Sequence, residues 1–378
     1  MRNKIIIIGA GKIGTTIFNF LSIFDTLDLT LADTNKDSLS DINSANNSNT
    51  HRRTLLLENN CNFDSLFQQH NFQAVINAGP FSLSIPLAQA AFDRELSYFD
   101  LTEDVQSCKF IQALTKSSSS QHVFVPQCGL APGFISILAR YLYGQFDRLE
   151  NVQLRVGALP QFPTNQMLYN LTWSTAGLVN EYCNLCQGIE QGELVNQAPL
   201  ENKELFSLEG VEYEAFNTSG GLGTLTQTLA GKVEQLNYKT VRYPGHRDLM
   251  KFLLRDLKFQ HEDKRESLVQ LLDNSIPMTA QDTVLIMVTV SGDVKQTQNG
   301  MKHYQQLTEL RRIYHQTIEL PDQKPQEYSA IQICTAASLC AVLELWLNNR
   351  LPNTGFVRQE NISLELFYQT HYGQYLMP

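Results

Sequence analysis

The chain has 378 residues, of which 43% are hydrophobic and 18% are charged, and its formal net charge is −9 at pH 7. This length and composition are ordinary for a soluble globular protein of two domains and exclude a largely disordered chain. The negative charge argues against nucleic acid or an acidic membrane surface as the main partner, because both require a basic face.

The N-terminal residues argue against a secretory leader. Ile5 to Ile8 lead directly into a glycine turn, and the sequence has no uninterrupted run of eighteen apolar residues. We therefore expect a cytoplasmic protein with no membrane partner. The seven cysteines are scattered and odd in number, which favours reduced thiols. Cys183 and Cys186 form one CxxC in a stretch expected to be helical, without a second Cys or His pair nearby, so we expect no metal site.

The first fourteen residues contain a strand followed by a glycine fingerprint. Ile5 to Ile8 form a short apolar strand, and Gly9, Ala10, Gly11, Lys12, Ile13 and Gly14 follow it. Gly9 permits a tight turn, Gly11 lets backbone amides approach a pyrophosphate, and Gly14 lets the next helix, 12–24, pack on the strand. The N-terminus of that helix favours phosphate. The sequence predicts a dinucleotide site with Gly9, Gly11, Lys12, Ile13 and Gly14 in contact with the cofactor.

A second strand, 28–32, ends at Asp33, about twenty residues beyond the last glycine, as the fingerprint requires. An acidic residue there accepts hydrogen bonds from the ribose hydroxyls of NAD and repels the 2′-phosphate of NADP. We therefore expect NAD, with NADP disfavoured, although Lys36 softens that exclusion. The alternative is that Asp33 only caps the following helix.

Strands and helices then alternate up to residue 130. The expected strands are 53–57, 74–77, 98–101 and 122–125, the expected helices are 63–70, 83–94 and 106–116, and surface loops are expected at 41–50 and 117–120. Strands separated by single helices pair in parallel through right-handed crossovers. Residues 1–130 thus predict an α/β, doubly wound parallel sheet of the Rossmann type.

Ligands of such a sheet lie outside the carboxyl ends of its strands. This rule selects Asn77, Ala78, Gly79 and Pro80 for the cofactor, Thr102 for substrate contact, and Asp100 for proton transfer. Each assignment has a structural alternative. Asn77 to Pro80 could form a plain turn with no ligand, and Asp100 could serve only to cap the next helix.

From Gly129 the pattern changes to a second, α+β substrate domain, 131–328. A helix with Pro132 in its first turn is expected to reach about residue 146. Strands with period-two alternation follow at 152–158, 167–173, 238–243 and 283–291, and Asn299-Gly300 predicts a hairpin turn before an extended stretch at 307–318. We expect an open antiparallel or mixed sheet. A C-terminal segment, 329–378, begins with an apolar helix, 329–348, expected to pack back on the nucleotide domain.

Three internal motifs carry a resemblance to a known family. They are Gly-Leu-Ala-Pro-Gly at 129–133, Glu-Ala-Phe-Asn-Thr-Ser-Gly-Gly at 214–221, and Tyr-Lys-Thr-Val-Arg-Tyr-Pro-Gly-His at 238–246. With the glycine fingerprint, they resemble the saccharopine dehydrogenase-like oxidoreductases, most closely the lysine 6-dehydrogenase branch. The resemblance runs from residue 1 to about 257. It implies reversible hydride transfer between an amine-bearing carbon and nicotinamide, a substrate in the cleft between two domains, and a homodimer or homotetramer built through the second domain.

Two motifs disagree about the substrate. Lysine 6-dehydrogenase-like members oxidise the ε-amine of lysine, whereas saccharopine reductase-like members condense the semialdehyde with glutamate and reduce the product. Residues 170–175 resemble the saccharopine reductase branch. Ala131, which we place in the substrate site, stands where that branch carries an acidic residue and points back to the lysine branch.

The local chemistry of the second domain suggests how an amino acid would bind. Arg242, beside Tyr243, offers a charged fork for a carboxylate, and Thr218, Ser219 and Gly220 supply hydroxyls and backbone amides. Alternatively, Arg242 makes a surface salt bridge and the glycines form a simple bend.

Oxidation of an amine also needs a base, and His246 titrates in a suitable range. The alternative is a histidine at a helix start, hydrogen-bonded to backbone. Two rival functions are kept: reductive condensation of an aldehyde with an amine, as in carboxynorspermidine synthases, and a catalytically inactive NAD-binding sensor.

Overall fold

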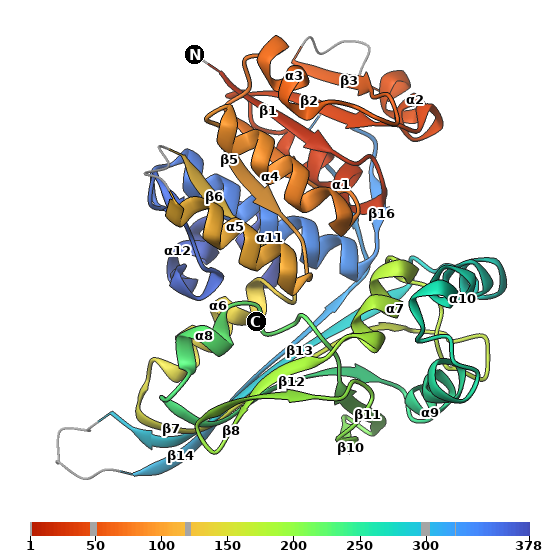
Figure 1. Ribbon diagram of the computed structural model, residues 1–378, viewed down its shortest axis with the longest axis vertical. Coiled ribbons are helices and arrows are strands. Elements are labelled where there is room, and N and C mark those ends of the chain that lie inside the picture. Colours follow the sequence, from red (N-terminus) through yellow and green to blue (C-terminus); the bar gives the residue numbers. More distant parts are fainter. Residues whose placement is uncertain (1, 46–50, 118–121, 296–302, 322) are drawn as a thin grey trace. The chain divides into compact units, whose positions relative to one another are not determined.

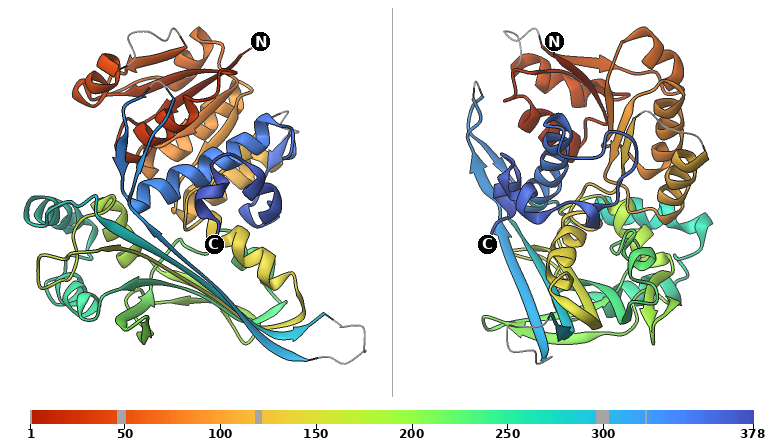
Figure 2. Two further views of the ribbon diagram at one scale, coloured as in Figure 1. Left: turned by 180° about the vertical axis from the view of Figure 1, so that it is seen from behind. Right: turned by 90° about the vertical axis from the view of Figure 1, so that its left-hand side faces the viewer.

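The computed structural model describes residues 2–45, 51–117, 122–295, 303–321 and 323–378, in two compact units. The first unit contains Met1–Phe134, Thr317–Gln326 and Gln332–Met377, and the second contains Ile135–Gln316 and Glu327–Ile331. The first unit thus takes in most of the C-terminal segment. The ribbon is shown in Figures 1 and 2.

A seven-stranded parallel sheet forms the centre of the first unit, in the order β17-β6-β5-β4-β1-β2-β3. Its strands are β1 (Asn3–Ile8), β2 (Leu27–Asp33), β3 (Arg52–Leu56), β4 (Ala74–Asn77), β5 (Ser97–Asp100), β6 (Val123–Val125) and β17 (Gly355–Phe356). The chain adds β2 and β3 on one side of β1 and then returns to the other side with β4. This confirms the predicted doubly wound sheet, and it brings the carboxyl ends of β1 and β4 together at the switch point.

Helices cover both faces of this sheet (Figure 2). They are α1 (Lys12–Leu21), α2 (Lys36–Ala45), α3 (Phe63–Gln69), α4 (Ser84–Asp93), α5 (Val105–Ser117), α11 (Ala330–Leu347) and α12 (Leu364–Gln369). On one face, α3, α4 and α5 pack on side chains that include Ile6, Val75 and Phe124. On the other face, α11 packs on β5 through Phe99 and Trp346, whose ring centroids are 5.5 Å apart.

Among the described residues, α11 is the one helix that is long and apolar enough to cross a membrane. Within the protein, 72% of this helix is buried. Its apolar composition is therefore accounted for by packing in a core, where a helix that is hydrophobic all round is expected.

The second unit is built on an eight-stranded mixed sheet, as expected. The main path runs β10-β11-β12-β7-β13-β14, and β8 pairs with β12 and β9. Its strands are β7 (Phe146–Pro160), β8 (Cys186–Glu190), β9 (Glu193–Gln197), β10 (Glu204–Leu208), β11 (Val211–Asn217), β12 (Val233–Arg242), β13 (Asp282–Val294) and β14 (Tyr304–Tyr314). Only β12 and β7 run parallel among the described pairs of this sheet. A two-stranded ribbon, β15 (Gln316–Ile318) and β16 (Gln326–Tyr328), lies where the chain passes between units.

Helices gather against one face of this sheet around Tyr182, Phe216 and Met250 (Figure 1). The helices of the second unit are α6 (Phe134–Tyr143), α7 (Thr175–Cys183), α8 (Leu225–Leu229), α9 (His246–Lys251) and α10 (Glu262–Ser275), with a π-helical turn at Phe252–Asp256. Side chains of α7, α9 and α10 thus pack in one core with Phe216 of β11.

Some expected elements differ from those observed. Residues 167–173 form no strand: residues 169–172 are all buried, so burial does not alternate along them, and only an isolated bridge joins Leu171 to Met278. The helix expected from Pro132 begins at Phe134, because Gly133 has a φ of 136°.

The surface loop expected from residue 41 is also wrong at its start, since α2 continues to Ala45. Cys183 ends α7 and Cys186 begins β8, so the CxxC spans a helix end rather than lying within a helix. The expected loop residues 118–120 and the Asn299-Gly300 turn lie outside the described residues.

Candidate functional site

Steric contacts explain two glycines of the fingerprint but leave the third open. Gly9 has a φ of 107°, and a Cβ there would lie 2.8 Å from the backbone of Ala78. A Cβ on Gly14 would lie 1.9 Å from the carbonyl oxygen of Gly9. A Cβ on Gly11, in contrast, would meet no atom within 4 Å. The protein itself therefore does not require glycine at position 11, whereas a group lying against the turn would.

The start of α1 has the features of a phosphate site. Gly11 is its N-cap, no side chain caps the helix, and no acidic residue lies in its first turn. Lys12 and Ile13 are half-buried in that turn. The backbone amides of this first turn and the positive end of the helix dipole lie next to the exposed Gly11, which is the arrangement that binds a pyrophosphate. The residues present thus fit a dinucleotide.

Asp33 is joined to the same turn. Its Oδ2 accepts a 2.6 Å hydrogen bond from the amide of Ala10, and its Oδ1 accepts one of 2.8 Å from the amide of Asn35. The carboxylate therefore supports the glycine turn from the end of β2. A carboxylate oxygen can accept more than one hydrogen bond, so this arrangement still permits contact with ribose hydroxyls.

The residues after β4 lie beside the glycine turn. The amide of Ala78 donates to the carbonyl of Ile8 at 2.8 Å, and the side chain of Asn77 accepts from the amide of Gly79 at 3.1 Å. The same amide group of Asn77 donates to Ser84 at the start of α4. Asn77 through Pro80 is therefore a braced turn at the switch point, where the fold places a ligand.

Asp100, at the end of β5, is completely buried and cross-links several segments. Its Oδ1 accepts hydrogen bonds from the amides of Thr102 at 3.0 Å and Gln127 at 2.8 Å, and its Oδ2 accepts one from the hydroxyl of Tyr98 at 2.8 Å. Burial raises the pKa of Asp100 to about 6, although these hydrogen bonds oppose the rise. The carboxyl is thus partly protonated at mildly acidic pH, and its hydrogen-bond partners Tyr98, Thr102 and Gln127 all belong to the first unit.

Two predicted substrate residues belong to the same part of the first unit. The hydroxyl of Thr102 is buried and accepts from the amide of Asp104 at 3.1 Å, just before α5. Ala131 is half-buried in the turn before Phe134, whose amide donates to the carbonyl of Gly129 at 2.9 Å. These contacts give both residues a local structural role, and their contact with substrate stays a prediction.

In the second unit, Arg242 ends β12 and is 3% exposed. Its guanidinium carbon lies 5.2 Å from the centre of the Tyr169 ring, and one terminal nitrogen donates to the carbonyl of Val241. Its Nε has no hydrogen-bond partner among the described residues. Burial lowers the pKa of Arg242, but the facing Tyr182, Tyr169 and Glu181 raise it above its ordinary value, so the group stays charged.

None of the ion pairs that the described residues form includes this buried cation. A charge removed from water without a paired counter-ion is costly. An anionic ligand that reached the orphan Nε would therefore gain an unusually favourable partner.

His246 lies next to Arg242 at the start of α9. Its Nδ1 is 3.1 Å from the carbonyl of Met167, which can only accept, so Nδ1 carries the proton. Its Nε2 therefore accepts from the hydroxyl of Tyr182 at 3.1 Å. Burial, followed by the charge of Arg242, lowers the pKa of His246 to about 3. With both nitrogens occupied and the ring neutral, this environment favours a positioning role over proton transfer.

The other predicted substrate residues of this unit divide between two faces of the sheet. The hydroxyls of Thr218 and Thr240 lie 2.7 Å apart on the face of Arg242, and Ser219 follows, its amide bonded to the carbonyl of Glu181. Gly220 has a φ of 88°. Tyr243 lies on the opposite face, where its ring stacks on Tyr213 and its hydroxyl donates to Pro160. The structure therefore places Thr218 on the face of the sheet that carries Arg242, whereas Tyr243 lies on the other face.

Sequence reasoning missed Tyr169, Glu181 and Tyr182, which surround Arg242. Their only sequence signal is the i, i+4 spacing of Leu178 and Tyr182, which also describes an ordinary buried helix face. We name Tyr169, Tyr182, Arg242 and His246 the Arg242 cluster. In the described ranges, no group of three or more His, Cys, Asp or Glu is placed to hold a metal ion.

Comparisons with known proteins match almost the whole chain. Residues 5–124 match the saccharopine dehydrogenase NADP binding domain, and residues 129–373 match the saccharopine dehydrogenase C-terminal domain. Among solved structures, saccharopine dehydrogenase (L-Glu forming) from Saccharomyces cerevisiae has a TM-score of 0.71 at 12% identity, covering 97% of this chain and 95% of that one. An amine dehydrogenase from Mycobacterium smegmatis has a TM-score of 0.46 at 9% identity, covering 95% and 96%. The first likeness shows the fold, and the second is too distant to argue from.

Proposed function

The chain belongs to the saccharopine dehydrogenase family of NAD(P)-dependent amino-acid oxidoreductases, and from this premise we propose that it oxidises the C–N bond of an amino acid with NAD. The proposed donor is the amine of L-lysine or the secondary amine of saccharopine. The observation that carries the proposal is Arg242, a buried cation whose Nε has no hydrogen-bond partner in the described part of the chain. A substrate carboxylate would supply that partner.

In this proposal the first unit holds the cofactor with backbone groups. The amides at the start of α1 bind the pyrophosphate, the open space at Gly11 admits it, and Asp33 accepts hydrogen bonds from the ribose. The nicotinamide accepts a hydride from the amine-bearing carbon. The turn from Asn77 to Pro80 lies beside the glycine turn and is proposed to line the nicotinamide half.

The choice of NAD rests on Asp33 and runs against the name of the matching domain, which is described as NADP binding. A carboxylate at the end of β2 repels a 2′-phosphate, and this local charge is the reason for proposing NAD. The ratio of activity with the two cofactors decides the point.

In the second unit, Arg242 is proposed to bind the substrate carboxylate, with Thr218 on the same face of the sheet. Tyr169 and Tyr182 keep water from the guanidinium, which strengthens its interaction with an anion. Asp100 and His246 stay the predicted proton acceptors, although the contacts of both favour structural roles. That substrate and nicotinamide face each other in one crevice also stays a prediction.

The proposal is tested by following NADH formation with L-lysine, saccharopine and L-ornithine separately, at alkaline pH, and by repeating the assay with NADP. We expect turnover of L-lysine or saccharopine and a preference for NAD. NADH binding without turnover of any of these amines, or of the corresponding aldehyde with an amine in the reverse direction, would contradict it.

A further inference from the structure

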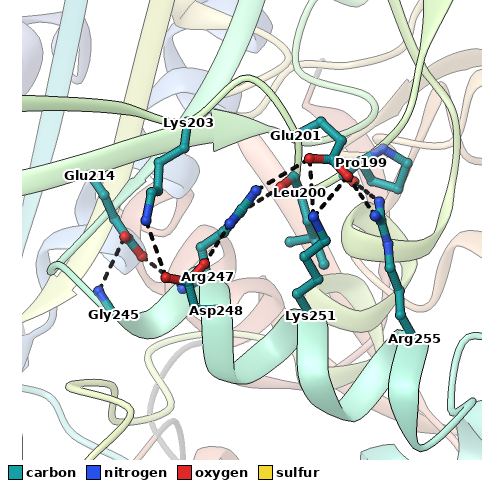
Figure 3. A network of polar contacts seen from close by, with 10 residues as sticks. All are labelled: Pro199, Leu200, Glu201, Lys203, Glu214, Gly245, Arg247, Asp248, Lys251 and Arg255. Atoms are coloured by element: carbon teal, nitrogen blue, oxygen red, sulfur yellow. Dashed lines mark hydrogen bonds and ion pairs between the residues drawn. The ribbon is translucent and has the colours of Figure 1, made fainter.

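The N-terminus of α9 is capped by a residue from a distant strand. Glu214, in β11, is 0% exposed. Its Oε2 accepts from the amide of Gly245 at 3.1 Å and its Oε1 accepts from the amide of Arg247 at 2.7 Å (Figure 3). The residue at the N-cap, Gly245, has no side chain that could do this. A carboxylate at this position satisfies free amides and complements the helix dipole.

The helix held in this way begins with His246, which connects it to the Arg242 cluster. The ring of His246 accepts from Tyr182 and lies 5.1 Å from the ring of Tyr169. Tyr169 in turn carries the guanidinium of Arg242 over its face. The first turn of α9 is therefore in contact, through His246, with both tyrosines that lie around the arginine.

Glu214 and Arg242 are also direct cross-strand neighbours. They oppose each other in the register of β11 and β12, so their side chains leave the sheet on the same face. Both are buried and oppositely charged, yet no hydrogen bond or ion pair joins them. Because the carboxylate is directed to the amides of α9, it does not neutralise Arg242.

A second set of contacts holds the same helix without reaching the Arg242 cluster. Glu201 forms ion pairs with Arg247 at 3.2 Å and Lys251 at 2.9 Å, and also with Arg255 (Figure 3). Its side chain is 34% exposed, so these pairs are partly screened by water. Glu201 thus offers a matched control: a carboxylate that supports α9 from outside.

We propose that Glu214 is a positioning residue for the substrate carboxylate: by binding the first turn of α9, it places the Arg242 cluster and leaves Arg242 unpaired for an incoming anion. This rests on the proposed function, in which Arg242 binds that carboxylate. Glu214 itself touches neither substrate nor cofactor in this scheme.

The kinetic test compares Glu214→Gln with Glu201→Gln. Glutamine keeps one acceptor but presents an NH2 group to the second amide, so the turn shifts. With L-lysine as substrate, we expect Glu214→Gln to raise KM about tenfold or more, to leave KM for NAD unchanged, and to alter turnover of cadaverine, which lacks the carboxylate, much less. Glu201→Gln should leave all three values near those of the parent. Equal losses with lysine and cadaverine would overturn the proposal, since they indicate general disruption.

A second measurement does not depend on turnover. In 15N-histidine spectra, the contacts predict a single Nδ1-protonated tautomer for His246, identified by its loss in His246→Gln. Glu214→Gln should change the ring nitrogen signals toward a mixture of tautomers, whereas Glu201→Gln should not. Unchanged signals would overturn the role of Glu214 whatever the assays give. Changed signals in a protein that oxidises none of the amines would instead retain Glu214 as a positioning residue and reject the proposed function.

Discussion

The amide of Ala10 donates a 2.6 Å hydrogen bond to the carboxylate of Asp33, which ties the turn after β1 to the end of β2. The residue expected to choose between cofactors therefore also supports the turn expected to bind their common pyrophosphate. A change at Asp33 should act on both.

Replacing Asp33 with alanine should reduce the preference for NAD over NADP, because it removes a charged acceptor for the ribose and the repulsion of a 2′-phosphate. A hydrogen bond to a charged group contributes about 1.5–3 kcal/mol, so we expect kcat/KM for NAD to fall about tenfold or more. Steady-state kinetics with both cofactors measure the ratio. An unchanged ratio would reject the assignment of Asp33 to the ribose.

Gly11→Ala should weaken cofactor binding without loss of stability, whereas Gly14→Ala should reduce the stability of the protein itself. A Cβ at position 11 meets nothing within 4 Å, so this variant should keep its melting temperature but bind NADH more weakly. A Cβ at position 14 would lie 1.9 Å from the oxygen of Gly9, so that variant should be destabilised without any ligand. Thermal unfolding and NADH fluorescence titration distinguish them. Equal NADH affinity in Gly11→Ala and the parent would argue against pyrophosphate at this turn.

Arg242→Ala should raise KM for the amino-acid substrate by the loss of a charged hydrogen bond, about 1.5–3 kcal/mol. Because none of the ion pairs among the described residues includes Arg242, its removal breaks no ion pair there, and the loss of stability should be modest. Arg242→Lys, which retains charge but not the fork, should fall between parent and alanine. A variant that turns over the substrate as well as the parent would show that the carboxylate binds elsewhere.

Asp100→Asn separates a proton-transfer role from a cross-linking role. The amide keeps an acceptor for the Thr102 and Gln127 amides, so the cross-link should survive, and activity should persist where Asp100 serves only as that cross-link. Loss of a general base would instead lower kcat by about 10²–10⁴. Since burial raises the pKa of Asp100 from 3.8 to about 6, its stabilising contribution is present below 3.8 and is lost as pH rises through 6. The variant should lack that loss in urea unfolding measured from pH 4 to pH 7.

The contribution of His246 to stability should depend on pH in the opposite direction to that of Asp100. Its pKa is depressed from 6.5 to about 3, so its contribution to stability is present above 6.5 and is lost as pH falls toward 3. His246→Gln should reduce the slope of unfolding free energy against pH by up to about 1.4 kcal/mol per pH unit in that window. The pH–rate profile between pH 6 and 9 should keep its shape. Loss of an ionisation from that profile would instead identify His246 as the base.

The sequence by itself determined the architecture of the first unit. Strand–helix alternation, the three glycines and Asp33 are local signals, and each acts through its own backbone or over one βαβ crossover. The atoms that exclude a side chain at Gly9 and Gly14 belong to the glycine turn itself and to the turn after β4. The order of strands in a doubly wound sheet already predicts that these two turns are neighbours. The sequence also predicted that the second unit contains an antiparallel or mixed sheet. Period-two alternation is a local signal of a half-buried strand, whichever strand it pairs with.

Only the tertiary structure decided how the polar residues are used. Residues 167–173 alternate like a strand but have no partner in register, because pairing depends on segments far away in the sequence. His246 has the composition of a base, yet burial and the nearby Arg242 hold it neutral. The cross-strand placement of Glu214 opposite Arg242, and the turning of its carboxylate toward α9, follow from packing between strand and helix, and no spacing of residues along the chain encodes them.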